Sequence, residues 1–591
     1  NGERNPITTV VLNGLTSLYL SWGKLDKAYD YAVRAFESNT KDFTFSKDVD
    51  SLLSQIPKAD FLSLPKIINS YINLINILEK QNKEEPYFRA LQHATAYLLE
   101  SKSKQQFDAD KLAILEKTRT LSNWATAVAV KSPEKYAAEA FSITESNKAM
   151  LLADVLKARK LQSFGGLPDS LTAKEQDLQG QLGALKKELI DEQNPIVVRE
   201  LNAQLSNTNE AIRDYHNLIK KDYPKYHRSM YYQDGFSVAA LQKNLDKETV
   251  LLEYLWVENK LYTYLLTADE IKIFEKNVNV EDLENLVLKY RRSLSDYDLL
   301  VMDPELAYES YTSSATDLYA ILLAEPLKTI KDKKHLIIVP DQSLGHIPFE
   351  ALLVSFAKEV NANYGELDYL VKHYKLSYSY SAALLLEGNQ ANVALKKDKL
   401  ELLAIAPKYK GATKAALVRS PRLRYLRDAL DDLPAAKLEV EALSKIVKGR
   451  FYYGEDANEK EFKANASSYG IIHLAMHGLL DKEYPIRSAL AFYENGDSTE
   501  DNFLQAYEIS QMQLNAQLVV LSACETGYGK FQQGEGVMSL ARSFMYAGVP
   551  SLVVSLWQVN DQSTSIIMQE FYKNLAKGMD KAAALQKAKL Y

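Results

Sequence analysis

Two short stretches decide the fold that this sequence predicts. They are G-I-I-H-L-A-M-H-G at 470–478 and A-Q-L-V-V-L-S-A-C-E-T-G at 516–527. Each contains an apolar, β-branched run that ends at a polar residue close to a glycine. The polar residues are His477 and Cys524, and Cys524 is the only cysteine in the chain. The two stretches therefore predict a pair of buried strands that each deliver one reactive side chain.

The predicted strands are Ile471 to Met476 and Leu518 to Ala523, which have the length and composition of buried parallel strands. Ligands of open α/β sheets bind outside the carboxyl ends of the strands. If the two strands are neighbours, His477 and Cys524 project into one crevice.

The chemistry follows from these residue types. A thiol becomes a strong nucleophile when an imidazole takes its proton, and the imidazole can return that proton to a leaving amine. The backbone N–H groups of Gly478 and Cys524 are candidates for holding the oxyanion. The histidine comes first, and the separation is 524 − 477 = 47 positions, which is similar to the order and distance in caspases.

Several further motifs occur in the order typical of one family. With H-L-A-M-H-G and L-S-A-C-E-T-G they resemble the CHAT domain, a caspase-like and separase-like cysteine peptidase module of the clan CD type. The other motifs are V-P-D-Q-S-L-G-H-I-P-F-E-A-L-L (339–353), Y-S-Y-S-A-A-L-L-L (378–386), L-P-A-A-K-L-E-V-E-A-L (433–443) and G-E-G-V-M-S-L-A-R-S-F-M-Y-A-G-V-P-S-L-V-V-S-L-W-Q-V-N-D (534–561).

The resemblance implies a general base at His477 and a nucleophile at Cys524. It also implies a bacterial TPR-CHAT protein, a type in which a partner triggers cleavage of a specific protein in defence or cell-death systems. Two other functions stay open. One is a non-catalytic TPR scaffold with an unreactive peptidase fold. The other is acyl transfer from the same thioester to an acceptor other than water.

A specificity residue is also implied by resemblance. W-Q-V-N-D is similar to a separase segment in which an acidic residue receives a basic P1 side chain, so Asp561 is a candidate for the base of an S1 pocket. The alternative is that Asp561 caps a helix starting near Gln562.

Other residues are expected to be structural. His473 lies inside a strand and is expected to be a core histidine. We expect no zinc at His473-x-x-x-His477, because the segment is predicted to be a strand and lacks the metalloprotease glutamate. Asp341 and Glu350 are expected to shape a loop. The glycine-rich loop 525–536 lacks the P-loop pattern, so it is interpreted as a mobile activation element, and we expect no nucleotide, metal or other cofactor.

Composition is ordinary for a globular protein, with 46% apolar and 25% charged residues in 591. The net charge is −6, so the sequence lacks the excess of basic residues that is typical of nucleic-acid-binding proteins. A single cysteine fits a reducing compartment, and no apolar run reaches the ~18 residues of a membrane span, so we expect a cytoplasmic protein. Because the chain opens on Asn1 rather than Met, we expect a processed or cut segment, so the sequence leaves open whether a targeting sequence preceded it.

The domain organisation follows from changes of periodicity. Residues 1–160 are predicted to form TPR-like helical repeats that bind an activating partner, with Ala28, Ala32 and Ala35 on one helix face after a turn at Gly23. Residues 161–245 are predicted to be a long helical hairpin or linker, 246–400 a pseudo-peptidase half and 401–591 the catalytic half. In the pseudo-peptidase half, two strands are predicted to form a hairpin around the turn at Glu258–Asn259. In the catalytic half, Val537 to Ala547 is predicted to be a helix ended by Gly548.

The predicted fold is therefore multidomain: a TPR-like α-helical solenoid followed by a caspase-like α/β domain with a mostly parallel sheet. Relatives of this type continue with an aromatic-rich final strand beyond the position of Tyr591. Its absence from the sequence predicts an unpaired sheet edge and reduced intrinsic activity.

Overall fold

The computed structural model describes most of the residues of the chain. They are 4–59, 61–103, 108–146, 148–163, 167–192, 194–224, 226, 236–356, 363–387, 401–409, 430–481, 483–495, 500–522, 527, 529–532, 535–557 and 559–591. The chain divides into two units, which are treated separately. The first is Asn1–Met150 with Tyr231–Ala239 and Ile271–Glu275, and the second is Leu151–Met230, Ala240–Glu270 and Lys276–Tyr591.

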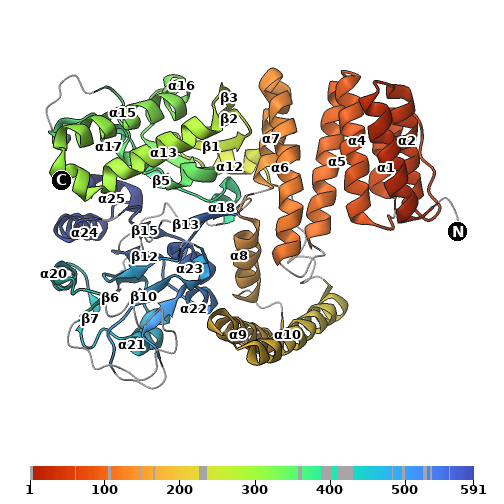
Figure 1. Cartoon of the computed structure of the whole chain (residues 1–591). Helices are drawn as coiled ribbons and strands as arrows, with labels where there is room; N and C mark the ends of the chain where they lie inside the picture. Colours follow the sequence, from red (N-terminus) through yellow and green to blue (C-terminus); the bar gives the residue numbers. More distant parts are fainter. Residues whose placement is uncertain are drawn as a thin grey trace. The chain divides into compact units, whose positions relative to one another are not determined.

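The first unit is built of helices that follow one another along the chain and stand side by side (Figure 1). They are α1 (Pro6–Ser21), α2 (Leu25–Ser38), α3 (Val49–Gln55), α4 (Leu64–Lys80), α5 (Glu84–Ser103), α6 (Asp108–Lys131) and α7 (Pro133–Glu145), with a 3₁₀ turn η1 (Ile56–Lys58) after α3.

Local sequence explains where the first helices begin and end. The side chain of Asn5 accepts hydrogen bonds from the backbone N–H groups of Ile7 and Thr8, and Pro6 occupies the first turn, where a missing N–H is harmless. Gly23, with φ of +69°, turns the chain between α1 and α2. Ala28, Ala32 and Ala35 are fully buried, so the predicted small-residue face of α2 is confirmed.

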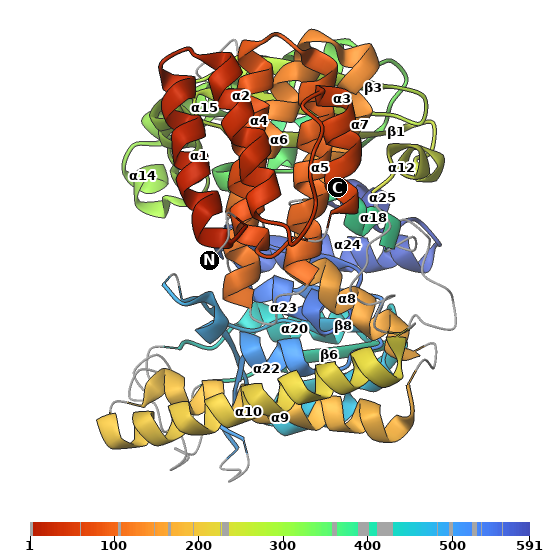
Figure 2. The same cartoon turned by 90° about the vertical axis from the view of Figure 1, so that its right-hand side faces the viewer.

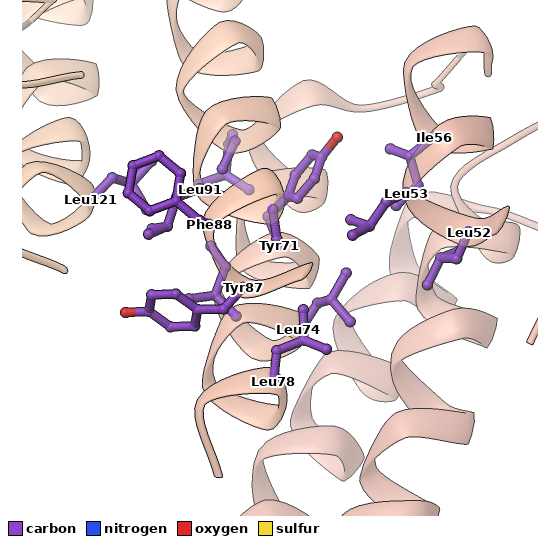
Figure 3. Packing of buried hydrophobic residues seen from close by; sticks show 14 of the residues in the cluster. Leu52, Leu53, Ile56, Tyr71, Leu74, Leu78, Tyr87, Phe88, Leu91 and Leu121 are labelled. Carbon is purple, nitrogen blue, oxygen red and sulfur yellow. The ribbon is translucent and has the colours of Figure 1, made fainter. Parts of the chain in front are cut away.

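One apolar core joins the successive helices. Figure 3 shows Leu53 and Ile56 facing Tyr71 of α4, with Phe88 and Leu91 of α5 on the other side. Because each helix buries its face against its neighbours in sequence, the unit has the local packing expected of helical repeats.

Three more helices open the second unit, namely α8 (Met150–Ser163), α9 (Asp169–Asp191) and α10 (Pro195–Asp222). The helices α9 and α10 lie side by side and run antiparallel (Figure 2). Leu178 of α9 packs with Tyr215 and Ile219 of α10 in a small apolar cluster.

The first sheet of this unit contains β2 (Lys260–Leu266), β1 (Thr249–Val257), β4 (His335–Val339) and β5 (Lys375–Tyr378), in that spatial order. The strands β1 and β2 are antiparallel, and Val257 pairs with Lys260 across the two-residue turn at Glu258 and Asn259, which confirms the predicted hairpin. The strands β4 and β5 are parallel to β1.

Further elements lie between positions 238 and 387, of which 238–239 and 271–275 belong to the first unit. They are α12 (Val238–Asn244), β3 (Ile271–Asn277), α13 (Val280–Ser295), α14 (Tyr297–Met302), α15 (Pro304–Leu322), α16 (Ala324–Lys328), η2 (Gln342–His346), η3 (Phe349–Ala351), η4 (Tyr364–Glu366), α17 (Leu370–His373) and α18 (Ala382–Glu387).

The second sheet is parallel throughout, in the order β15-β12-β8-β6-β7. Its strands are β6 (Leu402–Pro407), β7 (Gly449–Gly454), β8 (Ile471–Leu474), β12 (Leu518–Leu521) and β15 (Leu552–Val554). A smaller antiparallel sheet has the order β11-β10-β9, from β9 (Gly478–Leu479), β10 (Ala489–Ala491) and β11 (Phe503–Gln505). The helices around them are α20 (Pro434–Leu443), α21 (Glu459–Asn465), α22 (Ala506–Gln511), α23 (Leu540–Tyr546), α24 (Asp561–Ala576) and α25 (Lys581–Leu590), with the 3₁₀ turns η6 (Ala466–Ser468) and η7 (Pro485–Arg487).

Both faces of the second sheet are buried, which explains its unbroken apolar strands. Val519 and Leu521 of β12 enter one core cluster, whereas Leu518 and Val520 enter another on the opposite face. This alternation is the two-residue period of a strand. The strand β12 is paired on both sides, with β8 and β15, and so is an interior strand of the sheet.

One predicted element is wrong. A helix was expected from Val537 to Ala547, but Gly536–Ser539 forms strand β14, which pairs antiparallel with β13 (Gly529–Gln532), and the helix α23 begins only at Leu540. The cross-strand pairing with β13 outweighs the helical pattern of the sequence. The described part of the predicted mobile loop is therefore a β-hairpin.

The predicted architecture is confirmed at the level of an N-terminal helical region followed by an α/β region with parallel strands. Among the described residues, no helix combines the length and apolar character needed to cross a bilayer.

Candidate active site

The strands that were predicted to carry the reactive pair are direct neighbours. β8 and β12 are parallel, and Leu474 pairs with Leu521 at the last position of their register. His477 comes three positions after Leu474, and Cys524 comes three positions after Leu521. Cys524 itself lies outside the described residues. The two strands therefore end at the same level of the sheet. His477 and Cys524 each follow three positions later in the sequence.

His477 is held through its backbone and through its ring. Its N–H donates to the hydroxyl oxygen of Tyr409 at 3.0 Å, and its carbonyl oxygen accepts from the N–H of Ala491 at 3.1 Å. Its Nε2 lies 2.7 Å from the carbonyl oxygen of Asp431. Its ring centroid is 4.8 Å from that of Tyr409.

The partner of Nε2 fixes the tautomer of the neutral ring. A carbonyl oxygen can only accept, so the proton of a neutral His477 sits on Nε2, and Nδ1 carries the lone pair. No described residue hydrogen-bonds that Nδ1. The arrangement leaves one basic nitrogen ready to take a proton.

Tyr409 is itself fixed in place. Its hydroxyl group donates to the carbonyl oxygen of Ala491 at 3.0 Å, and its N–H donates to Oδ1 of Asp432 at 2.6 Å. Tyr409 and the Asp431–Asp432 segment thus hold each other and His477 together. Sequence reasoning missed both, because Tyr409 acts by its hydroxyl and Asp431 by a backbone carbonyl, which leave no motif.

Gly478 begins the edge strand β9 and pairs with Leu490 of β10. The hydrogen bond from Ala491 N–H to the His477 carbonyl flanks this pair. In an antiparallel ladder, a pair flanked in this way is the non-hydrogen-bonded kind, so the Gly478 N–H points away from β10. The Gly478 N–H, which is a candidate for holding the oxyanion, is therefore not used in a hydrogen bond to β10.

The alternative role of Asp561 is wrong, because another residue caps the helix. α24 begins at Asp561, and the side chain of Asn560 accepts from the N–H groups of Gln562 and Ser563. Asn560 is therefore the N-cap. The side chain of Asp561 lies outside the described part of the structure, and its role in an S1 pocket stays a prediction.

His473 is a core histidine, as expected. It is fully buried, with Nε2 at 2.7 Å from Oε1 of Glu439 and Nδ1 at 3.2 Å from the hydroxyl oxygen of Tyr572. Both ring nitrogens are engaged, which leaves none for a metal. Burial raises the pKa of Tyr572 well above its usual value, so its hydroxyl group stays protonated.

The two carboxylates of the first half have structural roles, also as expected. Asp341 is buried and accepts the backbone N–H of Trp256 at 2.7 Å. Glu350 pairs with Lys589 at 3.0 Å and accepts the hydroxyl group of Tyr378.

One cluster of three carboxylates among the described residues has the close spacing of metal ligands. It consists of Glu459, Glu500 and Glu508. The ammonium group of Lys463 lies 2.7, 2.7 and 3.3 Å from their oxygens. A lysine therefore already supplies the positive charge at this point, and the cluster gives no reason to expect a metal.

A parallel sheet whose neighbouring strands lead to a histidine and a cysteine is the arrangement of the caspase-like peptidase fold. Residues 312–591 match the CHAT domain family, so this part of the chain is a CHAT domain. It is also 23% identical to human tetratricopeptide repeat protein 28 over 290 residues, and 21% identical to the mouse protein of the same name. Each match covers 43% of this chain and 11% of the relative, so the chain spans about a tenth of the length of these curated relatives.

Proposed function

We propose that the chain is a cysteine endopeptidase of the caspase and separase type. The observation that carries the proposal is the shared register of β8 and β12, which ends at Leu474 and Leu521 with His477 and Cys524 three positions beyond each. A nucleophile and its base need this kind of juxtaposition at the carboxyl edge of a sheet.

The proposed mechanism begins with proton transfer from the Cys524 thiol to Nδ1 of His477. The thiolate attacks the carbonyl carbon of a peptide bond, and the N–H groups of Gly478 and Cys524 hold the oxyanion. The C–N bond then breaks, and the leaving amine takes the proton from Nδ1. A water molecule, deprotonated by the same nitrogen, hydrolyses the thioester and restores the thiol.

Three contacts of His477 support its role as the base. The Asp431 carbonyl keeps the other ring proton on Nε2, the Tyr409 hydroxyl fixes the backbone, and the Tyr409 ring lies against the imidazole. An aromatic face and a carbonyl oxygen both favour the imidazolium that forms during the reaction.

The proposal extends to specificity and control. Asp561 at the base of an S1 pocket would select Arg or Lys at P1, and an Asp561→Asn variant should lose that preference on a panel of fluorogenic peptides. The helical region would bind a protein partner that regulates cleavage. Equal turnover of basic and neutral P1 residues by the unmodified chain would remove the S1 assignment.

The test is intact-mass spectrometry after treatment with iodoacetamide or an acyloxymethyl-ketone probe at neutral pH. Because the chain has one cysteine, any adduct reports on Cys524. We expect faster labelling in the folded protein than in denaturant, and a loss of about 100-fold in the His477→Ala variant.

The matched control is His373→Ala, which removes an exposed histidine that pairs with Asp368. It should label at the unmodified rate. If Cys524 reacts only after denaturation, or if His477→Ala labels as fast as the control, the peptidase proposal fails and a non-catalytic scaffold takes its place.

A further inference from the structure

The segment L-G-H-I-P-F at 344–349 contacts the cysteine-bearing half from the other half of the CHAT domain. The Nε2 of His346, at the end of η2, lies 2.9 Å from the carbonyl oxygen of Gly529. Gly529 opens the β13–β14 hairpin five positions after Cys524. A side chain from the first half thus holds the backbone that follows the nucleophile.

Arg291 of α13 connects the same place to a second segment. One nitrogen of its guanidinium group donates to the carbonyl oxygen of His346 at 2.9 Å, and another donates to the carbonyl oxygen of Leu556 at 3.0 Å. Leu556 lies just after β15, the strand on the other side of β12 from β8. The first half therefore holds one carbonyl on each of two segments.

These two segments also hold each other, at a point three positions after Cys524 in the sequence. The N–H of Gly527 donates to the carbonyl oxygen of Ser555 at 3.0 Å. A Cβ at Gly527 would come within 2.8 Å of the side chains of Val554 and Leu556, so no larger residue fits without a shift. The backbone three positions after Cys524 is thus pressed against the end of β15.

Close packing joins η2 to the hairpin as well. A Cβ at Gly345 would lie 2.6 Å from a methyl carbon of Val537 on β14, so only glycine allows this approach. The position of His346 relative to Gly529 is therefore set by backbone packing as well as by the hydrogen bond.

The protonation state of His346 agrees with this geometry. Burial lowers the pKa of His346 below its usual value, and the positive charge of Arg291 lowers it further. The ring is neutral near pH 7, and because a carbonyl oxygen only accepts, its proton sits on Nε2 and points at Gly529.

We propose that His346 and Arg291 are positioning residues for the cysteine: they hold the Gly529 and Leu556 carbonyls and thereby fix the backbone that follows Cys524 in the sequence. The proposal rests on the peptidase function proposed above. Neither residue touches the substrate or the reacting atoms in this scheme. It gives a role to a motif that the reaction itself does not use.

The test compares His346→Leu, which removes the donor, with His346→Gln, which restores an N–H group on a side chain of similar length. His346→Leu should slow iodoacetamide labelling of Cys524 about tenfold and lower kcat with little change in KM, and His346→Gln should recover most of both losses. Arg291→Met should behave like His346→Leu.

The control is Tyr311→Phe, which removes another hydrogen bond from a side chain to a carbonyl in the same half, to Ala351. It should leave labelling unchanged. If it slows labelling as much as His346→Leu, or if His346→Gln fails to recover, the positioning role is overturned in favour of general destabilisation.

Hydrogen exchange separates this inference from the proposed function. In His346→Leu, the amides of 529–532 and 536–539 should exchange at least tenfold faster, whether or not the chain is a peptidase. Unchanged exchange at the hairpin overturns the positioning role alone. A folded protein whose Cys524 is unreactive, but whose hairpin loosens on mutation, overturns the peptidase proposal alone.

Discussion

The Nε2 atom of His477 lies 2.7 Å from the carbonyl oxygen of Asp431, so a backbone group completes the candidate pair of histidine and cysteine. A third group that orients the base is a general feature of activated nucleophiles. Here the group belongs to the main chain, and this distinction has a direct experimental consequence.

Replacing Asp431 by alanine should leave the reactivity of Cys524 within about twofold of the unmodified protein, because the accepting oxygen belongs to the peptide and survives the change. The measurement is the rate of iodoacetamide labelling followed by intact mass. A loss of tenfold or more would show that the carboxylate takes part.

Tyr409→Phe should affect both stability and reactivity. It removes the acceptor for the His477 N–H and the donor to the Ala491 carbonyl, and it keeps the ring. We expect a loss of about 1 to 2 kcal/mol in the free energy of unfolding and slower labelling of Cys524. Urea titration and labelling below the transition measure the two effects. Unchanged labelling would mean that the hydroxyl group does not position His477.

Glu439→Ala should destabilise the second unit without touching the candidate site. The change leaves Nε2 of the fully buried His473 without its partner at 2.7 Å, which costs about 2 to 3 kcal/mol. Glu439→Gln keeps an acceptor oxygen and should lose less. Calorimetric midpoints measure the difference, and equal midpoints for both variants would contradict the assignment.

Acid should weaken the second unit through His335. Burial, assisted by Lys375, lowers the pKa of His335 from 6.5 to about 4. Between pH 6.5 and pH 4 the unfolded chain binds a proton at His335 and the folded chain does not. The contribution of His335 to the free energy of unfolding is therefore fully present above pH 6.5 and is lost as the pH falls toward 4. The loss is about 3 kcal/mol for this residue.

The measurement is the unfolding midpoint at several pH values for the unmodified chain and for His335→Asn. The difference between the two should shrink or reverse as the solution is acidified. Parallel curves for the two proteins would show that His335 carries no proton linkage.

Sequence reasoning reached the parts of the fold that depend on periodicity. The apolar runs at β8 and β12 and the turn at Glu258–Asn259 are local patterns, and the structure has strands and a turn at these places. Both strands are shorter than predicted, because β8 ends at Leu474 rather than Met476 and β12 ends at Leu521 rather than Ala523. The start of α23 was predicted too early because residues 536–539 pair with the strand β13. The local helical pattern of the sequence contains no information about that pairing. At these residues the pairing between strands decided the structure, and the local helix preference did not.

The candidate site divides in the same way. His477 was found because it ends an apolar run, and its neighbouring strand was found by the same rule. Tyr409, Asp431 and His346 were not, because each acts through a hydrogen bond between a side chain and a backbone group far apart in sequence, 68, 46 and 183 positions from its partner. No spacing rule predicts such contacts.

The hydrogen bond from the Tyr409 N–H to Asp432 joins residues 23 positions apart and so closes a loop. Two partners of His477 stand at this hydrogen bond, Tyr409 at one end and Asp431 beside the other. One contact between distant positions therefore couples the backbone support of the histidine to the support of its ring, and a change at Asp432 that breaks it is expected to loosen both together.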